Sequence, residues 1–363
     1  MERTAGRTVD EIWRDVQPTL DEIASARARL HRKAVLIVGL LVTSYFLLVV
    51  ADSHVVVRAG AAMVLVVALV ALATGVMHDA NHGSFARRRG ANHALAYTSD
   101  ALGASSWLWR IQHNVLHHGN TNVVGFDADL ELAPFARLAP SQPWRRRYRY
   151  QHLYIWPLYG FLAMKNLLVS DVASLVSGRI GDRPLNRPVT GSVVTRIGAG
   201  KLSHLTWALA IPLLFNPWPA VLAVYVVCSW CVGFLLATVF QLAHCVEHVA
   251  MPDVDTPRRG PDRAGHQLDT TFDVASPPTL LGSGFRWLAG GLDHQVEHHL
   301  APQLPHTIYP MVARRFRAAC AAEGLEHRQH PGIGAALRSH TRWLRSMGRR
   351  PADLERSGFT AAL

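Results

Sequence analysis

The chain has 363 residues, with 49% hydrophobic residues, 17% charged residues and a formal net charge of +11. A disordered chain would need low hydrophobicity and a high charge density, so this composition excludes one. Four cysteines in this length also exclude a small secreted domain held together by disulfides. The 20 histidines are unusually many, and they require a chemical explanation.

Taken in chain order, four apolar runs predict membrane-spanning helices. The first two, at about 34–51 and 59–77, contain no formally charged residue. Each approaches the roughly 20 apolar residues that a spanning helix needs, and only a short turn separates them, so we expect a helical hairpin. The runs at 202–215 and 220–243 predict a second hairpin. The expected fold class is therefore all-α: an integral membrane protein with four transmembrane helices in two hairpins.

The distribution of Lys and Arg predicts the orientation of these helices. The segment 1–33 is rich in Arg, whereas the first hairpin turn has only Arg58 and the second has no basic residue. Basic loops stay on the cytoplasmic side, so both termini and the loop between the hairpins are predicted to be cytoplasmic. We expect an N-terminal cytoplasmic segment at 1–33, a membrane domain at 34–322 and a polar C-terminal tail at 323–363. The positive net charge is then explained by the basic residues of the cytoplasmic segments and by their attraction to anionic lipid. No nucleic-acid partner is therefore expected.

A basic and aromatic segment lies in the long loop between the hairpins. Its cations alternate with Trp and Tyr, which is typical of a belt at the membrane interface. The same cations are candidates to bind an anionic substrate head group. They are Arg145, Arg146, Arg147 and Arg149.

Ten of the histidines fall in four compact groups, and each group contains a pair four residues apart. On a helix, residues with this spacing lie on one face, so both imidazoles can reach one metal ion. Single histidines at a membrane interface are often only anchors, but four such groups near membrane boundaries favour a shared metal site. The pairs are His78/His82, His113/His117, His244/His248 and His294/His298.

The type of donor narrows the choice of metal. Imidazole ligands without thiolates suit Zn, Fe, Cu or Ni. A catalytic zinc ion needs only three protein ligands, so eight or more histidines exceed one ion and fit two. The zinc-protease motif HExxH is absent, because Asp79 follows His78. A two-iron centre at the membrane face fits this chemistry best.

Three of these groups resemble the histidine boxes of the membrane fatty acid desaturase family. HDANH at 78–82 matches the first box, HNVLHH at 113–118 the second and QVEHH at 295–299 the third. Gln295 in place of a leading His is similar to the front-end and linoleoyl-CoA-type subgroup. The resemblance covers about residues 34–320, with further matches at 240–244, 266–268, 270–271 and 290–292. It departs at Asp293-His294 and at Ala301, where other residues are common.

The resemblance implies a cytoplasmic cap with a di-iron site that uses O₂ to insert a double bond into an acyl chain. It implies that Gln295 takes part in catalysis, either by contacting the metal ligands from behind or by holding water beside the metal. It leaves His248 and His294 open as further ligands. Ligating histidines usually need partners for their second ring nitrogen, and the candidates are Asp79, Asn81, Asn114 and Glu297. The implied ligands of two iron ions are His78, His82, His113, His117, His118, His244, His298 and His299.

Each turnover needs two electrons from a donor. The sequence HPGI at 330–333 is similar to part of a cytochrome b5 motif, but too few residues follow it for a haem domain. We therefore expect a separate donor, such as a ferredoxin with its reductase. The expected substrate is a fatty acyl chain carried by CoA, a carrier protein or a membrane lipid. The expected location is a bacterial inner membrane or its equivalent, with the active site on the cytoplasmic side.

Two other functions remain open at this point. A hydroxylase, an acetylenase or another lipid oxygenase would use the same histidines, because a small change in substrate position decides the outcome. A metal transporter or sensor would place its ligands along a path at the middle of the membrane. Here the histidines lie at the predicted ends of the spans, which favours the desaturase.

Overall fold

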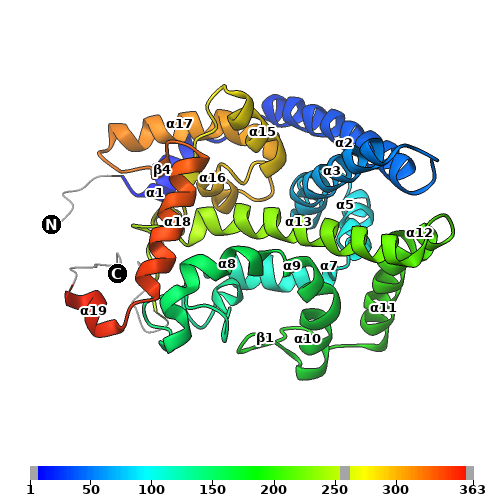
Figure 1. Cartoon of the computed structure of the whole chain (residues 1–363). Coiled ribbons are helices and arrows are strands. Elements are labelled where there is room, and N and C mark those ends of the chain that lie inside the picture. The colour runs from blue at the N-terminus through cyan, green and yellow to red at the C-terminus, as the bar shows by residue number, and fades with distance from the viewer. Residues whose placement is uncertain (1–6, 254–261, 357–363) are drawn as a thin grey trace. The chain divides into compact units, whose positions relative to one another are not determined.

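The computed structural model describes residues 7–253 and 262–356, which are mostly helical (Figure 1). The ends of the predicted N-terminal segment and of the predicted tail, residues 1–6 and 357–363, lie outside the described residues. The chain divides into two compact units. Unit 1 comprises Met1–Ala28, Leu116–Leu153 and Val239–Leu363, and unit 2 comprises Arg29–Val115 and Tyr154–Thr238. The predicted domain boundaries at 33 and 322 do not coincide with these limits and remain a prediction.

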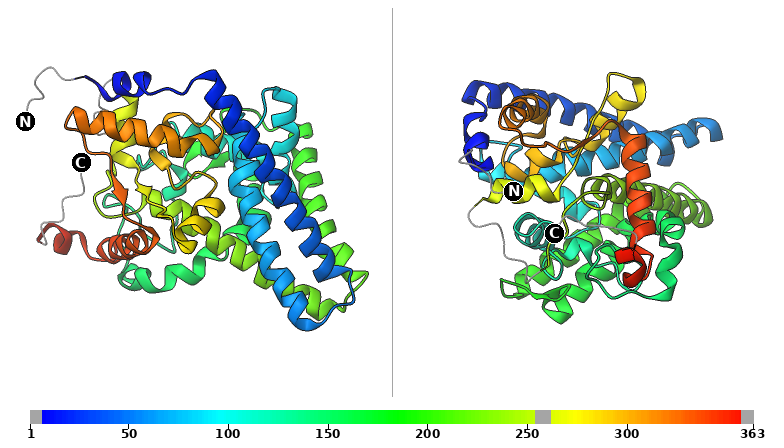
Figure 2. Two further views of the ribbon diagram at one scale, coloured as in Figure 1. Left: turned by 90° about the horizontal axis from the view of Figure 1, so that it is seen from above. Right: turned by 90° about the vertical axis from the view of Figure 1, so that its left-hand side faces the viewer.

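Unit 2 contains the hairpin predicted from the first two apolar runs. Helices α2 (Leu20–Val49) and α3 (Val55–Ala71) run side by side (Figures 1 and 2). Apolar residues near the end of α2 pack against the start of α3. Arg58 donates a hydrogen bond to the carbonyl of Leu48 at 2.8 Å, which ties the two helices together at the turn. The predicted hairpin is therefore confirmed.

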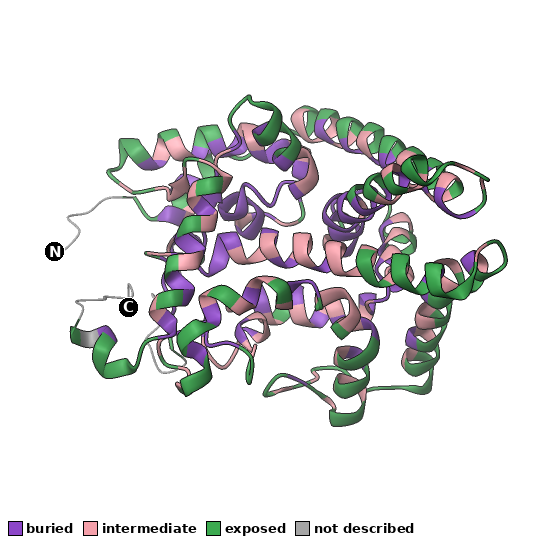
Figure 3. Ribbon diagram, viewed as in Figure 1, coloured by how far each residue is buried: buried purple, intermediate pink, exposed green. Residues whose placement is uncertain are grey.

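Three helices of the described residues are long and apolar enough to cross a membrane: Leu20–Val49, Val55–His82 and Trp218–His244. Apolar side chains point outward along them, as Val35, 74% exposed, and Val227, 60% exposed, illustrate. Figure 3 shows many exposed positions along α2. Large exposed apolar surface is typical of a protein that meets lipid.

The third predicted span, at 202–215, differs from the structure. Residues 202–215 belong to a helical run that begins at Gly191, and this run is not among the three. The polar side chains of Arg196 and Lys201 lie in the same run and lower its hydropathy. A fourth candidate is instead a broken helix, Arg146–Tyr159 with Leu162–Ser177, bent by 76°.

The remaining elements of unit 2 are short. The second spanning helix continues beyond α3 through η1 (Leu72–Met77) into α4 (His78–His82). A two-residue antiparallel hairpin is formed by β1 (Arg179–Ile180) and β2 (Arg183–Pro184). The other helices are α5 (Arg89–Ala96), α6 (Thr98–Ala101), α7 (Ser106–Trp109), α9 (Leu162–Lys165), η5 (Asn166–Ser170), α10 (Asp171–Ser177), α11 (Gly191–Leu205), η6 (Thr206–Ala210) and α12 (Ile211–Leu213). Among the described residues, four helices extend across a limit between the units, namely α2, η2 (Arg110–His117), α8 (Gln151–Tyr159) and α13 (Trp218–His244).

Two glycines allow α13 to pass close to the residue that follows α8. A Cβ atom on Gly233 would lie under 3.0 Å from the carbonyl oxygen of Gly160, and one on Gly160 would overlap the ring of Trp230. The Trp230 indole also donates a hydrogen bond to the carbonyl of Pro157 at 3.1 Å. This contact therefore requires residues without a side chain.

Replacing Gly233 with alanine is expected to destabilise the protein, because the methyl group would push two backbones apart. Overpacking of this kind typically costs about 1–3 kcal/mol. Gly198→Ala in α11 is the matched control, since a Cβ there meets open space and alanine favours a helix over glycine by roughly 0.5–1 kcal/mol. Thermal unfolding of the detergent-solubilised protein should show a lower Tm for Gly233→Ala alone. Equal Tm values in the two variants would contradict this explanation of the contact.

The core of unit 1 surrounds a short buried helix, α16 (Gln295–Leu300), which Figure 3 shows as buried. Val296 packs with Ile308 and Val312 in one apolar cluster, which also includes Ile12 of the N-terminal helix. The ring of Trp13 meets Phe316 edge-on at 5.1 Å between centroids. This cluster holds α16, and with it the third histidine motif, in a rigid core.

The C-terminal region is part of this core. In α18 (Ile333–Met347), the fully buried Trp343 donates a hydrogen bond to the carbonyl of Leu138 at 2.8 Å. A parallel two-residue sheet joins β3 (Asp273–Val274) to β4 (Gln329–His330). The predicted polar tail at 323–363 therefore includes a packed helix. The other elements of unit 1 are α1 (Val9–Asp15), η3 (Ala128–Leu130), η4 (Arg146–Tyr150), α14 (Arg263–Thr270), α15 (Leu280–Ala289), η7 (His306–Ile308), α17 (Tyr309–Ala322) and α19 (Pro351–Arg356).

Candidate metal centre

Three histidines converge in unit 2. His78 and His82 lie on α4, at the end of the second spanning helix, and His113 lies on η2 (Arg110–His117). Their ring centroids are 4.7 Å apart for His78 and His82, 5.3 Å for His78 and His113, and 5.1 Å for His82 and His113. One ring nitrogen of each lies within 4.8 Å of the others. The first two histidine motifs thus bring three imidazoles to one place.

π-Helical turns lie directly before the first motif and within the second. The turn η1 directly precedes His78, and η2 carries His113 and ends at His117. π-Helical turns inside α-helices are frequent at functional sites. On η2, the ring of Trp109 from the preceding turn stacks on His113 at 4.3 Å between centroids. The sequence predicted α-helical spacing for the second motif, but its histidines His113 and His117 lie on a π-helical turn.

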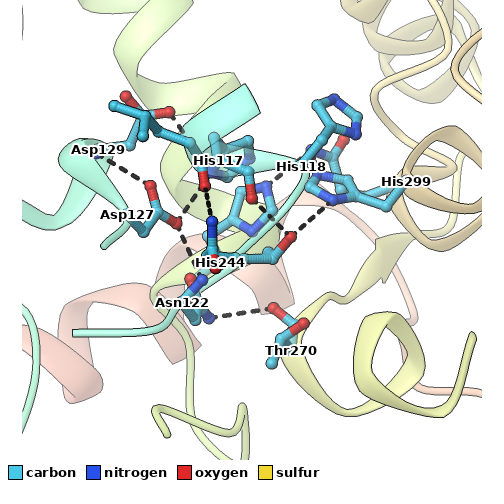
Figure 4. A network of polar contacts seen from close by, with 12 residues as sticks. His117, His118, Asn122, Asp127, Asp129, His244, Thr270 and His299 are labelled. Carbon is cyan, nitrogen blue, oxygen red and sulfur yellow. Dashed lines mark hydrogen bonds and ion pairs between the residues drawn. The ribbon is translucent and has the colours of Figure 1, made fainter. Parts of the chain in front are cut away.

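Five buried histidines converge in unit 1. Ring nitrogens of His117, His244 and His299 lie within 4.8 Å of one another, and those of His118, His298 and His299 do the same. The centroids of His117 and His244 are 4.7 Å apart, and those of His118 and His299 are 4.2 Å apart. Figure 4 shows how these rings face one another. His299 belongs to both groups and is the residue that they share.

A carboxylate fixes the ring of His117. Its Nδ1 lies 2.9 Å from Oδ2 of Asp127, and a carboxylate can only accept, so Nδ1 carries the proton and Nε2 is left for a metal. The same Oδ2 accepts the backbone N–H of Asn122 at 2.9 Å. Burial lowers the pKa of His117, but the carboxylates of Asp127 and Asp129 outweigh it and raise the pKa to about 9. Burial opposes ionisation of Asp127 too, yet His117 lowers its pKa.

The carboxamide of Gln267 fixes the ring of His299 in the same way. Nδ1 of His299 lies 3.0 Å from Oε1 of Gln267 and 3.0 Å from Oγ1 of Thr121. The Thr121 hydroxyl also donates to Oε1 of Gln267 at 2.9 Å. This oxygen accepts from His299, so Nε2 of His299 is again free of the proton and suited to a metal.

Asn122 holds the chain around His244. Its backbone is left-handed, with φ of 58°, a conformation that asparagine tolerates. Its side-chain N–H groups donate to the carbonyls of His244 at 2.9 Å and Thr270 at 3.0 Å (Figure 4). From α18, Nδ1 of His340 lies 2.6 Å from the carbonyl of Cys245. These contacts fix the position of His244 from both sides.

The structure places the other predicted residues as follows. The amide nitrogen of Gln295 lies 2.8 Å from Nε2 of His244 and 3.3 Å from Nε2 of His299, so Gln295 lies beside the predicted ligands. Nδ1 of His78 and Oδ1 of the buried Asp79 are 3.8 Å apart. Asn81 donates to the backbone carbonyl of Met77. The roles of these residues remain predictions.

Two further predicted residues have partners other than the ligand histidines, whereas His248 and four arginines lie on the surface. Asn114 donates to the backbone carbonyl of Asn81, and Glu297 accepts from His327. His248 is exposed, because α13 ends at His244 and His248 follows in a turn with φ of 69°. The exposed arginines of the basic segment, at and before η4, are Arg145, Arg146, Arg147 and Arg149.

Four residues that hold the ligand histidines in place are not predicted from the sequence: Asp127, Gln267, Thr121 and Asn122. Gln267 lies in the 266–268 segment that resembles the family, so the sequence contained a signal for it. Nothing in the local sequence distinguishes Asp127 from the other acidic residues nearby. Their partners are up to 178 residues away in the sequence, and only folding brings them together.

Replacing Gln267 with leucine is expected to weaken metal binding by about 10–100-fold, the usual cost of losing a partner that orients a ligand. The His299 ring would lose the acceptor that fixes its tautomer. Gln17→Leu is the control, because Gln17 bonds only the carbonyl of Trp13 within its own helix end. Titration with Fe(II) of metal-free protein measures both affinities. Unchanged affinity in Gln267→Leu would show that Thr121 alone suffices to hold His299.

The chemistry of these groups fits transition metals. Eight imidazoles in two units supply nitrogen donors, which suit iron or zinc. Burial, followed by the charges of Asp127 and Asp129, raises the pKa of the neighbouring Cys245 thiol. The residues present therefore fit a metal centre with nitrogen ligands.

Comparisons with known proteins agree with this chemistry. The fatty acid desaturase family model matches residues 53–331. An sn-1 linoleoyl-lipid 6-desaturase of Synechocystis sp. is 33% identical over 290 residues, which are 79% of each chain. An acyl-lipid (8-3)-desaturase of Physcomitrium patens is 32% identical over 328 residues, 87% of this chain and 66% of that protein. The sn-1 linoleoyl-lipid 6-desaturase of Arthrospira platensis is 31% identical over 283 residues, 77% of this chain and 75% of that protein.

The matched residues include all three histidine motifs and most of both units. The relatives are named as enzymes that desaturate acyl chains, in agreement with the predicted resemblance. The protein is an oxidoreductase acting on fatty acyl chains, and it belongs to the fatty acid desaturase family, in its front-end branch.

Proposed function

We propose that this enzyme inserts a double bond into the acyl chain of a membrane lipid, between an existing double bond and the carboxyl end. The observation that carries the proposal is that imidazoles lie together within each unit, from the first two histidine motifs in unit 2 and from the second and third motifs in unit 1. The lipid-linked substrate is supported by the relatives, whose names specify linoleoyl-lipid or acyl-lipid substrates. We favour this carrier over CoA and over a carrier protein.

The proposed cofactor is a pair of iron ions. A methylene group has no acidic proton, so acid–base side chains cannot begin the reaction, and the cofactor must carry it. When bound, the iron ions would activate O₂ and remove hydrogen from two neighbouring carbons. The ligands we propose are His78, His82, His113, His117, His118, His244, His298 and His299.

The chain's own residues prepare this site in two ways. Asp127 and Gln267 hold the rings of His117 and His299 with Nε2 available to a metal. Burial excludes water: His298 and His299 are at most 1% exposed. A dry and rigid site limits side reactions and keeps the substrate carbons in place.

Gln295 is the proposed catalytic residue outside the ligand set. Its amide lies between Nε2 of His244 and Nε2 of His299, where it can hold a water molecule or a product water by hydrogen bonding. Turning the amide by half a turn would instead present Oε1 to the metal. In either orientation of its amide, Gln295 lies beside the proposed ligands His244 and His299.

The proposal also includes the electron donor and the orientation of the protein in the membrane. We infer a separate donor, such as a ferredoxin with its reductase, which a basic cytoplasmic surface would attract. Both termini and the active site would face the cytoplasm, in a bacterial inner membrane or its equivalent. The exposed arginines of the basic segment would lie at the membrane interface, near lipid head groups.

The proposal is tested by expression in a host that makes linoleoyl lipids but has no front-end desaturase. We expect a new double bond on the carboxyl side of the existing ones, appearing first in intact lipids and only later in acyl-CoA. Time-resolved lipid and acyl-CoA profiles measure this order. First appearance in acyl-CoA would overturn the lipid substrate, and a hydroxylated product would overturn desaturation itself.

A further inference from the structure

A second group of metal-binding side chains lies in unit 1, and the proposed function does not use it. It consists of Asp273 in β3, His294 directly before α16, and Glu297 in α16. One ligand atom of each lies within 4.8 Å of the others. Asp273 and Glu297 are fully buried, and the side chain of His294 is 8% exposed.

Each of these side chains keeps a polar atom that no hydrogen bond uses. Asp273 accepts the backbone N–H of Val296 through Oδ1 at 3.1 Å, and Glu297 accepts from His327 through Oε1 at 2.9 Å. Among the described residues, Oδ2 of Asp273, Oε2 of Glu297 and both ring nitrogens of His294 have no hydrogen-bond partner. Buried polar atoms nearly always have one. These atoms are therefore available to a ligand.

The spacing of the group suits a small ion. Nδ1 of His294 lies 3.7 Å from Oδ2 of Asp273, which is too long for a hydrogen bond. Two ligands of a tetrahedral ion with bonds of about 2.0–2.2 Å are roughly 3.3–3.6 Å apart, close to this distance. The second carboxylate, Glu297, is oriented by His327 in the way that metal-binding carboxylates usually are.

We propose that Asp273, His294 and Glu297 form a second metal site, which binds a divalent transition-metal cation such as Zn²⁺ or Mn²⁺. Two carboxylates balance the charge of such an ion. The imidazole disfavours Mg²⁺ and Ca²⁺, which prefer oxygen ligands only. The site is distinct from the eight histidines, because neither Asp273 nor His294 belongs to that set.

Two further side chains lie near Oδ2 of Asp273. Nε2 of His327 is 3.7 Å from it and also bonds Glu297, and Arg317 carries a permanent charge. Nη2 of Arg317 lies 3.7 Å from Oδ2 of Asp273, but its side chain is 38% exposed and can move towards solvent. Removing its charge should favour the ion, so Arg317→Gln is expected to bind zinc several-fold more tightly. If Arg317 is instead the permanent counter-ion of a metal-free cluster, this variant would gain no zinc affinity.

The experiment counts metal in the full-length, detergent-solubilised protein, loaded with iron and then dialysed against zinc. Wild type is compared with Asp273→Asn and His294→Gln. Asp293→Asn is the matched control, because Asp293 is equally buried and accepts from Ser276. Its Oδ2 lies 3.8 Å from Nε2 of His294, but it is not in the group of three ligands, so this variant tests the effect of removing a neighbouring charge alone. We expect one zinc ion fewer per chain in the first two variants than in wild type and Asp293→Asn. Equal zinc in all four proteins, or an equal loss in Asp293→Asn, would overturn the proposal.

Iron content separates this test from that of the proposed function, since the difference of one zinc should persist whether or not the histidines hold iron. A gain of signal adds a second test for variants that lose stability. His294→Cys loaded with Co²⁺ is expected to show a sulfur-to-cobalt charge-transfer band that cobalt-loaded wild type lacks. No new band in the folded variant would contradict the site.

Discussion

Replacing His299 with alanine is expected to abolish desaturation and to release most of the bound metal. His299 is the residue shared by both histidine groups of unit 1, and its ring lies within 5.0 Å of those of His117, His118 and His244. The loss should exceed the roughly 10–100-fold that follows from removing a mere partner of a ligand. Iron per chain and the yield of desaturated lipid measure the effect.

The control for this variant is His248→Asn. His248 is exposed and follows the end of α13, and asparagine tolerates its left-handed backbone. Its activity should stay within about twofold of wild type, since surface substitutions usually have small effects. Normal iron content and activity in His299→Ala would mean that the histidines of unit 1 are not the ligands that we propose.

Replacing Asp127 with asparagine is expected to reduce metal affinity by about 10–100-fold, and activity with it. The asparagine keeps the size and can still accept the backbone N–H of Asn122. It removes the charge that orients His117 and holds the pKa of its ring at about 9. Fe(II) titration and desaturation assays of the same preparation give both quantities.

Asp129 provides a matched control for the same substitution. Its carboxylate lies 3.5 Å from Nδ1 of His117, but its side chain is 38% exposed to solvent. Solvent screens its interaction with the imidazole, so Asp129→Asn should have a much smaller effect on metal affinity. Equal losses in the two variants would show that the net charge near His117 matters, and that the hydrogen bond from His117 to Asp127 does not.

The sequence was sufficient for features that depend on local composition. The uncharged runs at 34–51 and 59–77 predict the hairpin of α2 and α3, because spanning helices need long apolar stretches. The histidine motifs predict convergent imidazoles, because their residue types and spacing are those of metal ligands. Within the described residues, the structure brings three of these imidazoles together in unit 2 and five in unit 1.

Other features depend on contacts that sequence patterns do not encode. The run at 202–215 is apolar, but it continues a helix that carries Arg196 and Lys201. His244 and His248 have helical spacing, yet the helix ends at His244, so only one of them is buried. The acceptor for His117 is Asp127, in a loop whose position depends on the tertiary fold.

The proposed second metal site also depends on contacts that the sequence pattern does not encode. From the sequence, His294 is a possible ligand of the same ions as His298, because the two lie four residues apart. The structure places it beside Asp273 and Glu297, and Asp273 comes from a strand about 20 residues earlier in the sequence. Spacing therefore indicates which side chains can bind metal, whereas the fold decides which of them share an ion.

We propose that these histidines hold a pair of iron ions. Mössbauer spectroscopy of full-length protein reconstituted with ⁵⁷Fe(II), together with iron analysis, distinguishes such a pair from single ions. We expect about two iron ions per chain with the spectrum of a coupled pair, and loss of that spectrum in His299→Ala. Zinc as the only bound metal after reconstitution, or a single uncoupled iron ion that His299→Ala leaves unchanged, would contradict it.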